Sequence, residues 1–227
     1  MIKKILAVAG FLIAVLILAE VLSLLQLRSS LTSYAKYWRN RQSTEGQITY
    51  LALGDSAAQG IGASQPSKGY VGLIADRLAQ KTGKTVRVVN LSVSGAKIKD
   101  VLDNQVPQLK DYTPDYVTIE IGANDLVAFD ADRFQSEYAQ LASVLPANTV
   151  VSNMPNFGGR IKRSQAVARA NVIVAEQAEQ HQLLLADLYT STKSHETPFN
   201  YAADFFHPNN SGYKNWADAF WTVLKTR

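Results

Sequence analysis

Five residues of the sequence have the types that acyl transfer through a serine requires. Such chemistry needs a nucleophile, a base within hydrogen-bond reach, a carboxylate that orients the base, and donors for the oxyanion that develops. In chain order, the residues are Ser56, Gly95, Asn124, Asp204 and His207. They come from separated parts of the chain, so the fold must bring them together before they can form a site.

Each of the five has a role that suits its chemistry. Ser56 is the predicted nucleophile and His207 the predicted base, and Asp204, three residues before His207, is close enough to orient the ring. We expect the backbone N–H groups of Ser56 and Gly95 and the side-chain amide of Asn124 to bind the oxyanion. A glycine at position 95 permits a backbone conformation that points its N–H into a site.

The elements that must position these residues are five apolar, β-rich runs that alternate with helix-like segments. The runs are expected to be strands buried on both faces, because they contain few polar residues. They cover 48–54, 86–91, 116–122, 148–153 and 183–189. The helical segments cover about 69–82, 98–110, 131–145 and 162–181, followed by a C-terminal amphipathic helix. This alternation predicts right-handed βαβ units and a parallel sheet, whose strand ends gather the polar residues at one edge.

Four short blocks carry a resemblance to a known family. "GDSAAQG" at 54–60, "SGA" at 94–96, "GAND" at 122–125 and "DFFHP" at 204–208 resemble, in order, the four blocks of the SGNH hydrolases, also called GDSL-type lipases and esterases. The resemblance covers about residues 48–225. It implies a flavodoxin-like three-layer α/β/α fold with a mainly parallel five-stranded sheet, and hydrolysis of carboxylic esters without a metal or another cofactor.

The sequence departs from the family's usual pattern at three positions. Ala57 follows the serine where many members have leucine, Ser92 stands where glycine is frequent, and Phe205 fills a position often held by glycine. None of these changes removes a reacting group. Phe205 and Phe206 beside the histidine, with Phe157 from a long loop, suggest a narrow or apolar acyl pocket, so we expect these three rings to bind substrate.

Residues 1–27 form a segment in which two lysines near the N-terminus precede a long apolar run. The run from Ile5 to Leu27 would span roughly 34 Å as a helix, which is enough to cross a bilayer. It is longer than the core of a cleaved signal peptide and offers only poor cleavage sites, so an uncleaved anchor is favoured. Glu20 lies beyond the middle of the run, where its carboxylate can extend toward the far interface.

Residues 28–46 form a basic, aromatic linker to a predicted hydrolase domain at 47–227. The stretch "SYAKYWRNRQ" at 33–42 suits either a membrane interface or a solvated linker helix. Charge does not set the orientation of the span, because basic residues flank both of its ends. We expect the catalytic domain on the extracytoplasmic side of the membrane, or as a secreted protein if the segment is cleaved.

Composition and charge exclude several classes of function. Residues 1–46 hold six basic and two acidic residues, whereas the rest of the chain holds 17 of each. The positive charge therefore belongs to the leader, and nucleic acid is not an expected partner. The sequence contains no cysteine, which rules out disulfides and thiolate metal sites; no metal site or cofactor is expected.

The sequence thus predicts a membrane-tethered serine hydrolase that cleaves small-molecule, lipid or glycan esters. Two alternatives stay open at this point. The same site is also that of an acyltransferase or of a deacetylase acting on envelope glycans, and a membrane-anchored binding module with a vestigial site is a non-enzymatic alternative.

Overall fold

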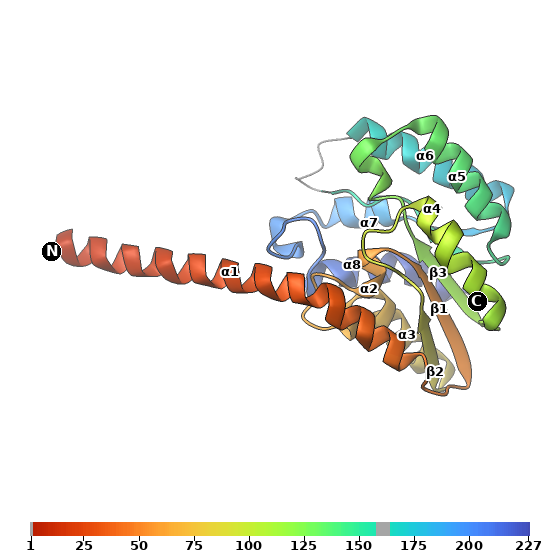
Figure 1. Cartoon of the computed structure of the whole chain (residues 1–227), viewed down its shortest axis with the longest axis horizontal. Helices are drawn as coiled ribbons and strands as arrows, with labels where there is room; N and C mark the ends of the chain where they lie inside the picture. The colour runs from red at the N-terminus through yellow and green to blue at the C-terminus, as the bar shows by residue number, and fades with distance from the viewer. Residues whose placement is uncertain (1, 158–163) are drawn as a thin grey trace.

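A parallel five-stranded sheet forms the centre of the domain (Figure 1). The computed structural model describes residues 2–157 and 164–227. The strands are β1 (Ile48–Gly54), β2 (Val86–Asn90), β3 (Tyr116–Glu120), β4 (Val150–Ser152) and β5 (Leu184–Ala186). Their order is β2-β1-β3-β4-β5, and every neighbouring pair is parallel. Flavodoxin-like proteins have this strand order, so the predicted fold class is confirmed.

Helices cover both faces of the sheet. The longer ones are α3 (Tyr70–Thr82), α5 (Ala131–Val144), α6 (Ser164–Gln180) and α8 (Asn210–Leu224). Helices α5 and α6 pack on one face, and α3 and α8 pack on the other (Figure 1). Successive residues of β1 show why both faces are buried, since Tyr50 faces the second layer and Leu51 the first, both without exposure. An apolar run of this kind is stable only between two helical layers.

Helix α8 begins immediately after the predicted base. The Asn209 side chain accepts hydrogen bonds from the backbone N–H groups of Ser211 and Gly212, at 2.9 and 3.1 Å, and so caps the helix. Further along, Trp216 and Phe220 bury the apolar face of α8 against the sheet. This cap and this face fix the chain just beyond His207.

The predicted strands at 86–91, 116–122, 148–153 and 183–189 are all shorter in the structure, and the last has a clear cause. The run at 183–189 is a strand only to Ala186, because Asp187 caps a helix that follows directly, α7 (Leu188–Ser194). The Asp187 carboxylate accepts a hydrogen bond from the Thr190 N–H at 3.1 Å. Leu188, which lies within the predicted strand, is therefore the first residue of a helix.

The predicted helix at 98–110 is three short pieces. It consists of α4 (Ile98–Asp100), a π-helical turn (Val101–Gln105) and a 3-10 helix (Val106–Asp111). Pro107 lies at the start of the last piece, where it lacks the N–H that a regular helix would use. The change of helix type turns Gln105 toward the sheet.

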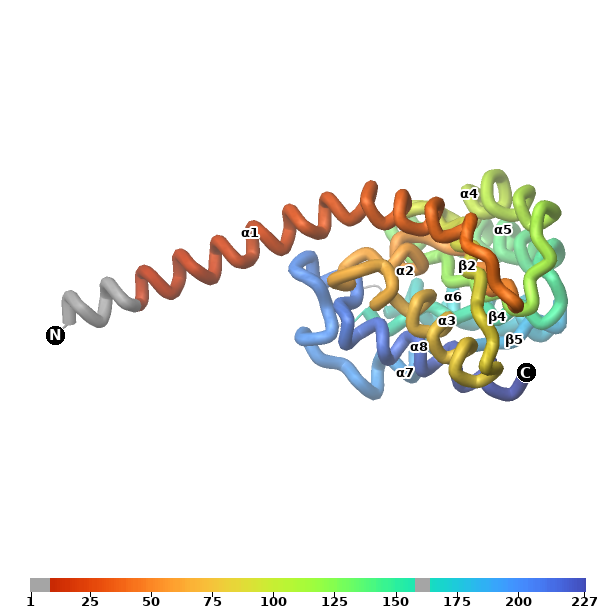
Figure 2. The backbone as a smooth tube through the Cα atoms, turned by 90° about the horizontal axis from the view of Figure 1, so that it is seen from below, coloured from red at the N-terminus to blue at the C-terminus, as the bar shows by residue number. Residues whose placement is uncertain are grey.

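Helix α1 (Ile2–Arg41) is one continuous helix whose first part projects away from the domain (Figures 1 and 2). Every side chain from Ala9 to Gln26 is exposed. The helix is long and apolar enough to cross a membrane, judged by length and composition. The exposed apolar side chains of this part of α1 are not packed against the domain, so another apolar environment is needed to bury them.

The second part of α1 packs on the domain beside the predicted nucleophile. Trp38 is 2% exposed and its Nε1 donates a hydrogen bond to the Gln59 carbonyl oxygen at 2.9 Å. The Tyr34 hydroxyl donates to the Ala63 carbonyl oxygen at 2.7 Å. The stretch at 33–42 was expected to lie at a membrane interface or in solvent. Tyr34 and Trp38 do neither, because their rings are buried against the domain.

Replacing Trp38 tests this docking. We expect Trp38→Ala to lower the free energy of unfolding by about 3–5 kcal/mol, because it removes a buried ring and leaves the Gln59 carbonyl unpaired. Lys36→Ala, at an exposed position of the same helix, should change it by less than about 0.5 kcal/mol. Urea unfolding of the full chain in detergent, followed by circular dichroism, measures both. Equal stability of the two variants would contradict the docked arrangement.

Candidate active site

Ser56 is the first residue of the short helix α2 (Ser56–Gln59), directly beyond the end of β1. Gly54 has a φ of +139°, and a Cβ added there would lie 2.3 Å from the Glu120 carbonyl oxygen, so only glycine fits beside β3. The next residue, Asp55, accepts a hydrogen bond from the Ala57 N–H at 2.9 Å and so caps α2. The chain thus turns sharply at the sheet edge and presents Ser56 there.

His207 lies in a loop that Asp204 holds in shape. One oxygen of the Asp204 carboxylate, Oδ1, accepts hydrogen bonds from the backbone N–H groups of Phe206 and His207, both at 3.0 Å. The Ala202 N–H donates to the His207 carbonyl oxygen at 2.8 Å. Phe205 has a φ of +52°, a conformation that side chains other than glycine seldom adopt and that these bonds enforce.

The structure brings Ser56, His207 and Asp204 into one hydrogen-bonded chain. His207 Nε2 lies 2.9 Å from Ser56 Oγ, across 151 positions of sequence, and His207 Nδ1 lies 2.5 Å from Asp204 Oδ2. Burial acts to raise the pKa of Asp204, but hydrogen bonds from the His207 ring and two backbone N–H groups outweigh it and hold the pKa below its ordinary value. A carboxylate that stays ionised favours the ring tautomer with its proton on Nδ1, which leaves Nε2 to accept from the serine.

Two of the predicted oxyanion donors have free N–H groups. Gly95 is the third residue of a turn in which the Ala96 N–H donates to the Val93 carbonyl oxygen at 3.0 Å, and its φ of +83° is the value that a type II turn requires there. Among the described residues, neither the Gly95 N–H nor the Ser56 N–H has an acceptor. Both remain available to an oxyanion.

The third predicted donor, Asn124, is engaged. Its amide nitrogen donates to Asp55 Oδ2 and to the Ala96 carbonyl oxygen, both at 3.0 Å. Asn124 therefore ties the loop of the nucleophile to the loop of Gly95. It must give up one of these two acceptors before it can donate to an oxyanion, and its role there stays a prediction.

Two of the three predicted aromatic side chains line a small cavity next to Ser56. The Phe157 and Phe206 rings are parallel with centroids 6.0 Å apart, and Phe206 also meets the His207 ring edge-on at 4.9 Å. The cavity holds about 30 Å³, roughly the space of one liquid water molecule. Phe205 is not part of this lining and is 47% exposed. The long loop that carries Phe157 continues at 158–163, outside the described residues.

Sequence reasoning missed Glu120, a fully buried acid at the end of β3. Glu120 lines the same cavity, and no donor of another described residue reaches either of its carboxyl oxygens. The Asp55 carboxylate is close enough to accept a hydrogen bond from a protonated Glu120. Burial first, and then the negative charge of Asp55, raise the pKa of Glu120 well above its ordinary value. Burial raises the pKa of Asp55 too, but the Ala57 N–H and His207 partly offset it, so Glu120 holds the proton. The sequence did hold a signal for this site, because Glu120 is the single charged residue in the apolar run at 116–122, which was expected to be buried on both faces.

Gln105 was also missed, although it fixes the strand that leads to Ser56. Its side chain is 1% exposed; its Oε1 accepts from the Gly54 N–H at 2.9 Å and its Nε2 donates to the Gly54 carbonyl oxygen at 2.8 Å. The amide thus replaces a neighbouring strand where β1 ends. No pattern in the sequence indicates this contact, because it depends on the π-helical turn.

The geometry agrees with a family-wide comparison. The chain matches the model of the GDSL-like lipase/acylhydrolase family over residues 52–214, which contain all five predicted site residues. The chain belongs to the GDSL-like lipase/acylhydrolase family. The resemblance expected from the four blocks is therefore confirmed at the level of the family.

Individual members of the GDSL-like lipase/acylhydrolase family match parts of the chain. An arylesterase of Vibrio mimicus is 37% identical over 119 residues, 48% of this chain and 58% of that protein. Esterase TesA of Pseudomonas aeruginosa is 32% identical over 136 residues, 57% of this chain and 66% of that protein. The chain thus spans about half to two-thirds of the length of these relatives.

A solved structure shares the fold. The crystal structure of Axe2, an acetylxylan esterase from Geobacillus stearothermophilus, has a TM-score of 0.65 at 22% sequence identity, over 78% of this chain and 94% of that one. At this identity the likeness concerns the arrangement of the sheet and helices, and it adds to the strand order as evidence for the fold.

Glu120→Gln tests the buried acid through the pH dependence of stability. Because the raised pKa keeps a proton on folded Glu120 that the unfolded chain releases, the wild-type chain loses stability as pH rises above the ordinary value of 4.5. The variant lacks this loss, so its stability relative to wild type should grow from about pH 5 to about pH 8, by up to about 1.4 kcal/mol per unit. Urea unfolding at each pH measures the difference. Exposed Glu179→Gln is the control and should show no such trend.

Proposed function

We propose that this chain is a serine ester hydrolase held at a membrane by α1, with Ser56 as nucleophile, His207 as base and Asp204 as the residue that orients the base. The observation that carries the proposal is the unbroken hydrogen-bond chain from Ser56 Oγ through the His207 ring to Asp204. Membership of a family of lipases and acylhydrolases, with esterases among the relatives, supports the same chemistry.

Acylation of the serine follows from this geometry. As Ser56 Oγ attacks the ester carbonyl carbon, its proton passes to His207 Nε2 over the 2.9 Å contact. The imidazolium that forms is stabilised by the ionised Asp204 carboxylate at Nδ1. The tetrahedral intermediate then collapses, the bond to the alcohol oxygen breaks, and the alcohol leaves with the proton from Nε2.

Deacylation repeats these steps with water. His207 Nε2 takes a proton from a water molecule, whose oxygen attacks the acyl-enzyme carbonyl, and the proton returns to Ser56 Oγ as the acid departs. The negative carbonyl oxygen of both intermediates would accept from the free Ser56 and Gly95 N–H groups. Each such donor is worth roughly 3–4 kcal/mol of transition-state stabilisation in related chemistry.

Helix α1 supports the tether. The part from Ala9 to Gln26 is exposed along its whole length, which is unlike the core helix of a soluble domain. The same helix continues without a break into the part that carries Tyr34 and Trp38, which pack on the domain. A bilayer around the exposed part would cover its apolar side chains, and the packed part would hold the active site close to that bilayer.

Ser56→Ala tests the nucleophile. The variant should lose hydrolysis of p-nitrophenyl acetate by a factor on the order of 10⁴ or more, since the attacking oxygen is gone. Its circular dichroism spectrum should not change. Ser143→Ala, on the exposed side of α5, is the matched control and should keep full activity and full labelling by a fluorophosphonate probe. Turnover by Ser56→Ala at the control's rate would overturn the proposal.

The small cavity predicts a preference for short acyl groups. Because Phe157 and Phe206 leave about 30 Å³ beside Ser56, we expect kcat/KM to fall by at least about tenfold from p-nitrophenyl acetate to the octanoate ester. Phe157→Ala should reduce or reverse this ratio, because removing a ring enlarges the cavity. Phe199→Ala, at a ring that is 83% exposed, should leave the ratio unchanged. A wild-type enzyme that prefers the octanoate ester would contradict this use of the cavity.

A further inference from the structure

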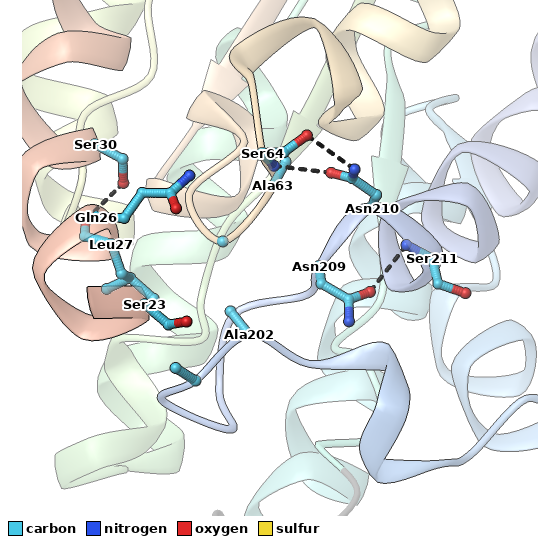
Figure 3. Close-up of a pocket in the computed structure, with 12 residues that line it drawn as sticks. Ser23, Gln26, Leu27, Ser30, Ala63, Ser64, Ala202, Asn209, Asn210 and Ser211 are labelled. Atoms are coloured by element: carbon cyan, nitrogen blue, oxygen red, sulfur yellow. Dashed lines mark hydrogen bonds between the residues drawn. The ribbon is translucent and has the colours of Figure 1, made fainter. Parts of the chain in front are cut away.

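A second and larger cavity lies where α1 meets the domain (Figure 3). It holds about 440 Å³ and is formed by about two turns of α1, the loop at 62–64, the loop at 202–209 and the start of α8. We call it the helix–domain cavity. Ser23 and Gln26 extend into it from α1, opposite Ser64 and Asn210 of the domain (Figure 3).

The helix–domain cavity is separate from the cavity beside Ser56. No lining residue is common to the two. Ala202 and Asn209 line the first, whereas Phe206 and His207, from the same loop, line the second. The proposed hydrolysis therefore does not account for the larger cavity.

The wall of the helix–domain cavity is uncharged and combines polar side chains with small apolar ones. The described residues that line it include serine hydroxyls and the amides of Gln26, Asn209 and Asn210, but no acidic or basic side chain. Ser64 and Asn210 bind each other twice, by Ser64 N–H to Asn210 Oδ1 at 2.8 Å and Asn210 Nδ2 to Ser64 Oγ at 2.9 Å, which fixes the domain side. Among the described residues the Gln26 amide has no hydrogen-bond partner, so it is free to bind a ligand.

The polar residues that interrupt the apolar run of α1 all face this way. At 100° per residue, Glu20, Ser23, Gln26, Ser30, Tyr34 and Trp38 fall within an arc of about 120° on the helix. Tyr34 and Trp38 are the side chains that pack on the domain, so the docked face continues outward as a polar stripe along the cavity. Such residues are costly in a lipid-facing position and are placed where they have a polar partner.

We propose that the helix–domain cavity binds the uncharged, hydroxyl-rich headgroup of a membrane lipid, such as a glycosyl diacylglycerol. The inference rests on the proposed tether, which puts the two turns at Ser23–Ser30 where α1 leaves the bilayer. Hydroxyl and amide groups match the hydroxyls of a sugar, and exposed apolar side chains of α1, Leu22 among them, provide a surface for the acyl chains. The described residues that line the cavity include no lysine or arginine to pair with a phosphate headgroup.

Photocrosslinking tests the site directly. The full chain with Ser56→Ala is reconstituted in phosphatidylcholine vesicles that contain a galactosyl diacylglycerol with a photoactivatable galactose. We expect adducts on the peptides that contain residues 23–30, 62–64 and 202–211. Unlabelled galactosyl diacylglycerol should compete, whereas free galactose and added phosphatidylglycerol should not. Competition by free galactose would overturn the lipid assignment, and competition by phosphatidylglycerol would overturn the uncharged headgroup.

Two tryptophan substitutions separate the cavity from general lipid contact. Gln26→Trp fills the cavity and should cut the adduct yield by at least about tenfold, equivalent to 1.4 kcal/mol. Leu25→Trp, on the opposite side of α1, should leave the yield unchanged. Equal yields from the two variants, or adducts spread over all of α1, would overturn the site.

Flotation of the vesicles distinguishes this proposal from the tether on which it depends. A chain that does not float with the vesicles would overturn the tether and this proposal together. A chain that floats but is crosslinked elsewhere would overturn the lipid site alone. Hydrolysis of p-nitrophenyl acetate by the Gln26→Trp and Leu25→Trp chains with Ser56 intact checks that both variants are folded.

Discussion

The two oxygens of the Asp204 carboxylate fix both the loop and the ring that the candidate site needs. Oδ1 receives two backbone N–H groups and thereby sets the path of the chain through Phe206 and His207. Oδ2 receives the ring nitrogen and sets the orientation of the imidazole. Because one side chain performs both tasks, the ring cannot turn away from Ser56 unless the loop also changes. A neutral amide could not perform both tasks, since only an ionised carboxylate offers two oxygens that accept all of these bonds at once.

The carboxyl ends of β1 and β3 carry a second group of acids with a different role. Asp55 caps α2 and also accepts from Asn124, so its negative charge is bound in place by donors. Glu120 lies in the same buried region without such donors. Folding therefore retains one charge and neutralises the other, at a cost in stability that a purely structural sheet edge would avoid. Sites that react commonly retain buried polar groups of this kind.

The sequence was sufficient for the fold because its signals are local and repeated. Apolar runs of strand length alternate with amphipathic segments, and short polar blocks end the runs at one edge. The elements that differ have non-local or competing causes. Asp187 ends β5 early by capping α7, and the contact of Gln105 with Gly54 depends on a π-helical turn that no periodicity indicates.

The candidate site was predictable in composition but not in its internal contacts. The types and order of Ser56, Asp204 and His207 suggested that His207 would contact both Ser56 and Asp204. The sequence did not reveal that the Asn124 amide donates hydrogen bonds to Asp55 and Ala96. Both partners lie in loops whose positions only the packed sheet defines. The same holds for Trp38, which is buried against a part of the domain that includes α2 and to which its ring N–H is hydrogen-bonded at Gln59.

The continuity of α1 has a consequence for the space in which the enzyme can search. A flexible linker lets a domain explore a volume around its anchor, whereas a helix that runs unbroken into a buried contact holds the domain at one height and one rotation. Adding a single residue between Gln26 and Tyr34 would raise the domain by about 1.5 Å and also rotate it by about 100°. The proposed active site would thus sweep a two-dimensional layer at a fixed distance from the bilayer, and its substrates would have to present their ester bonds within that layer.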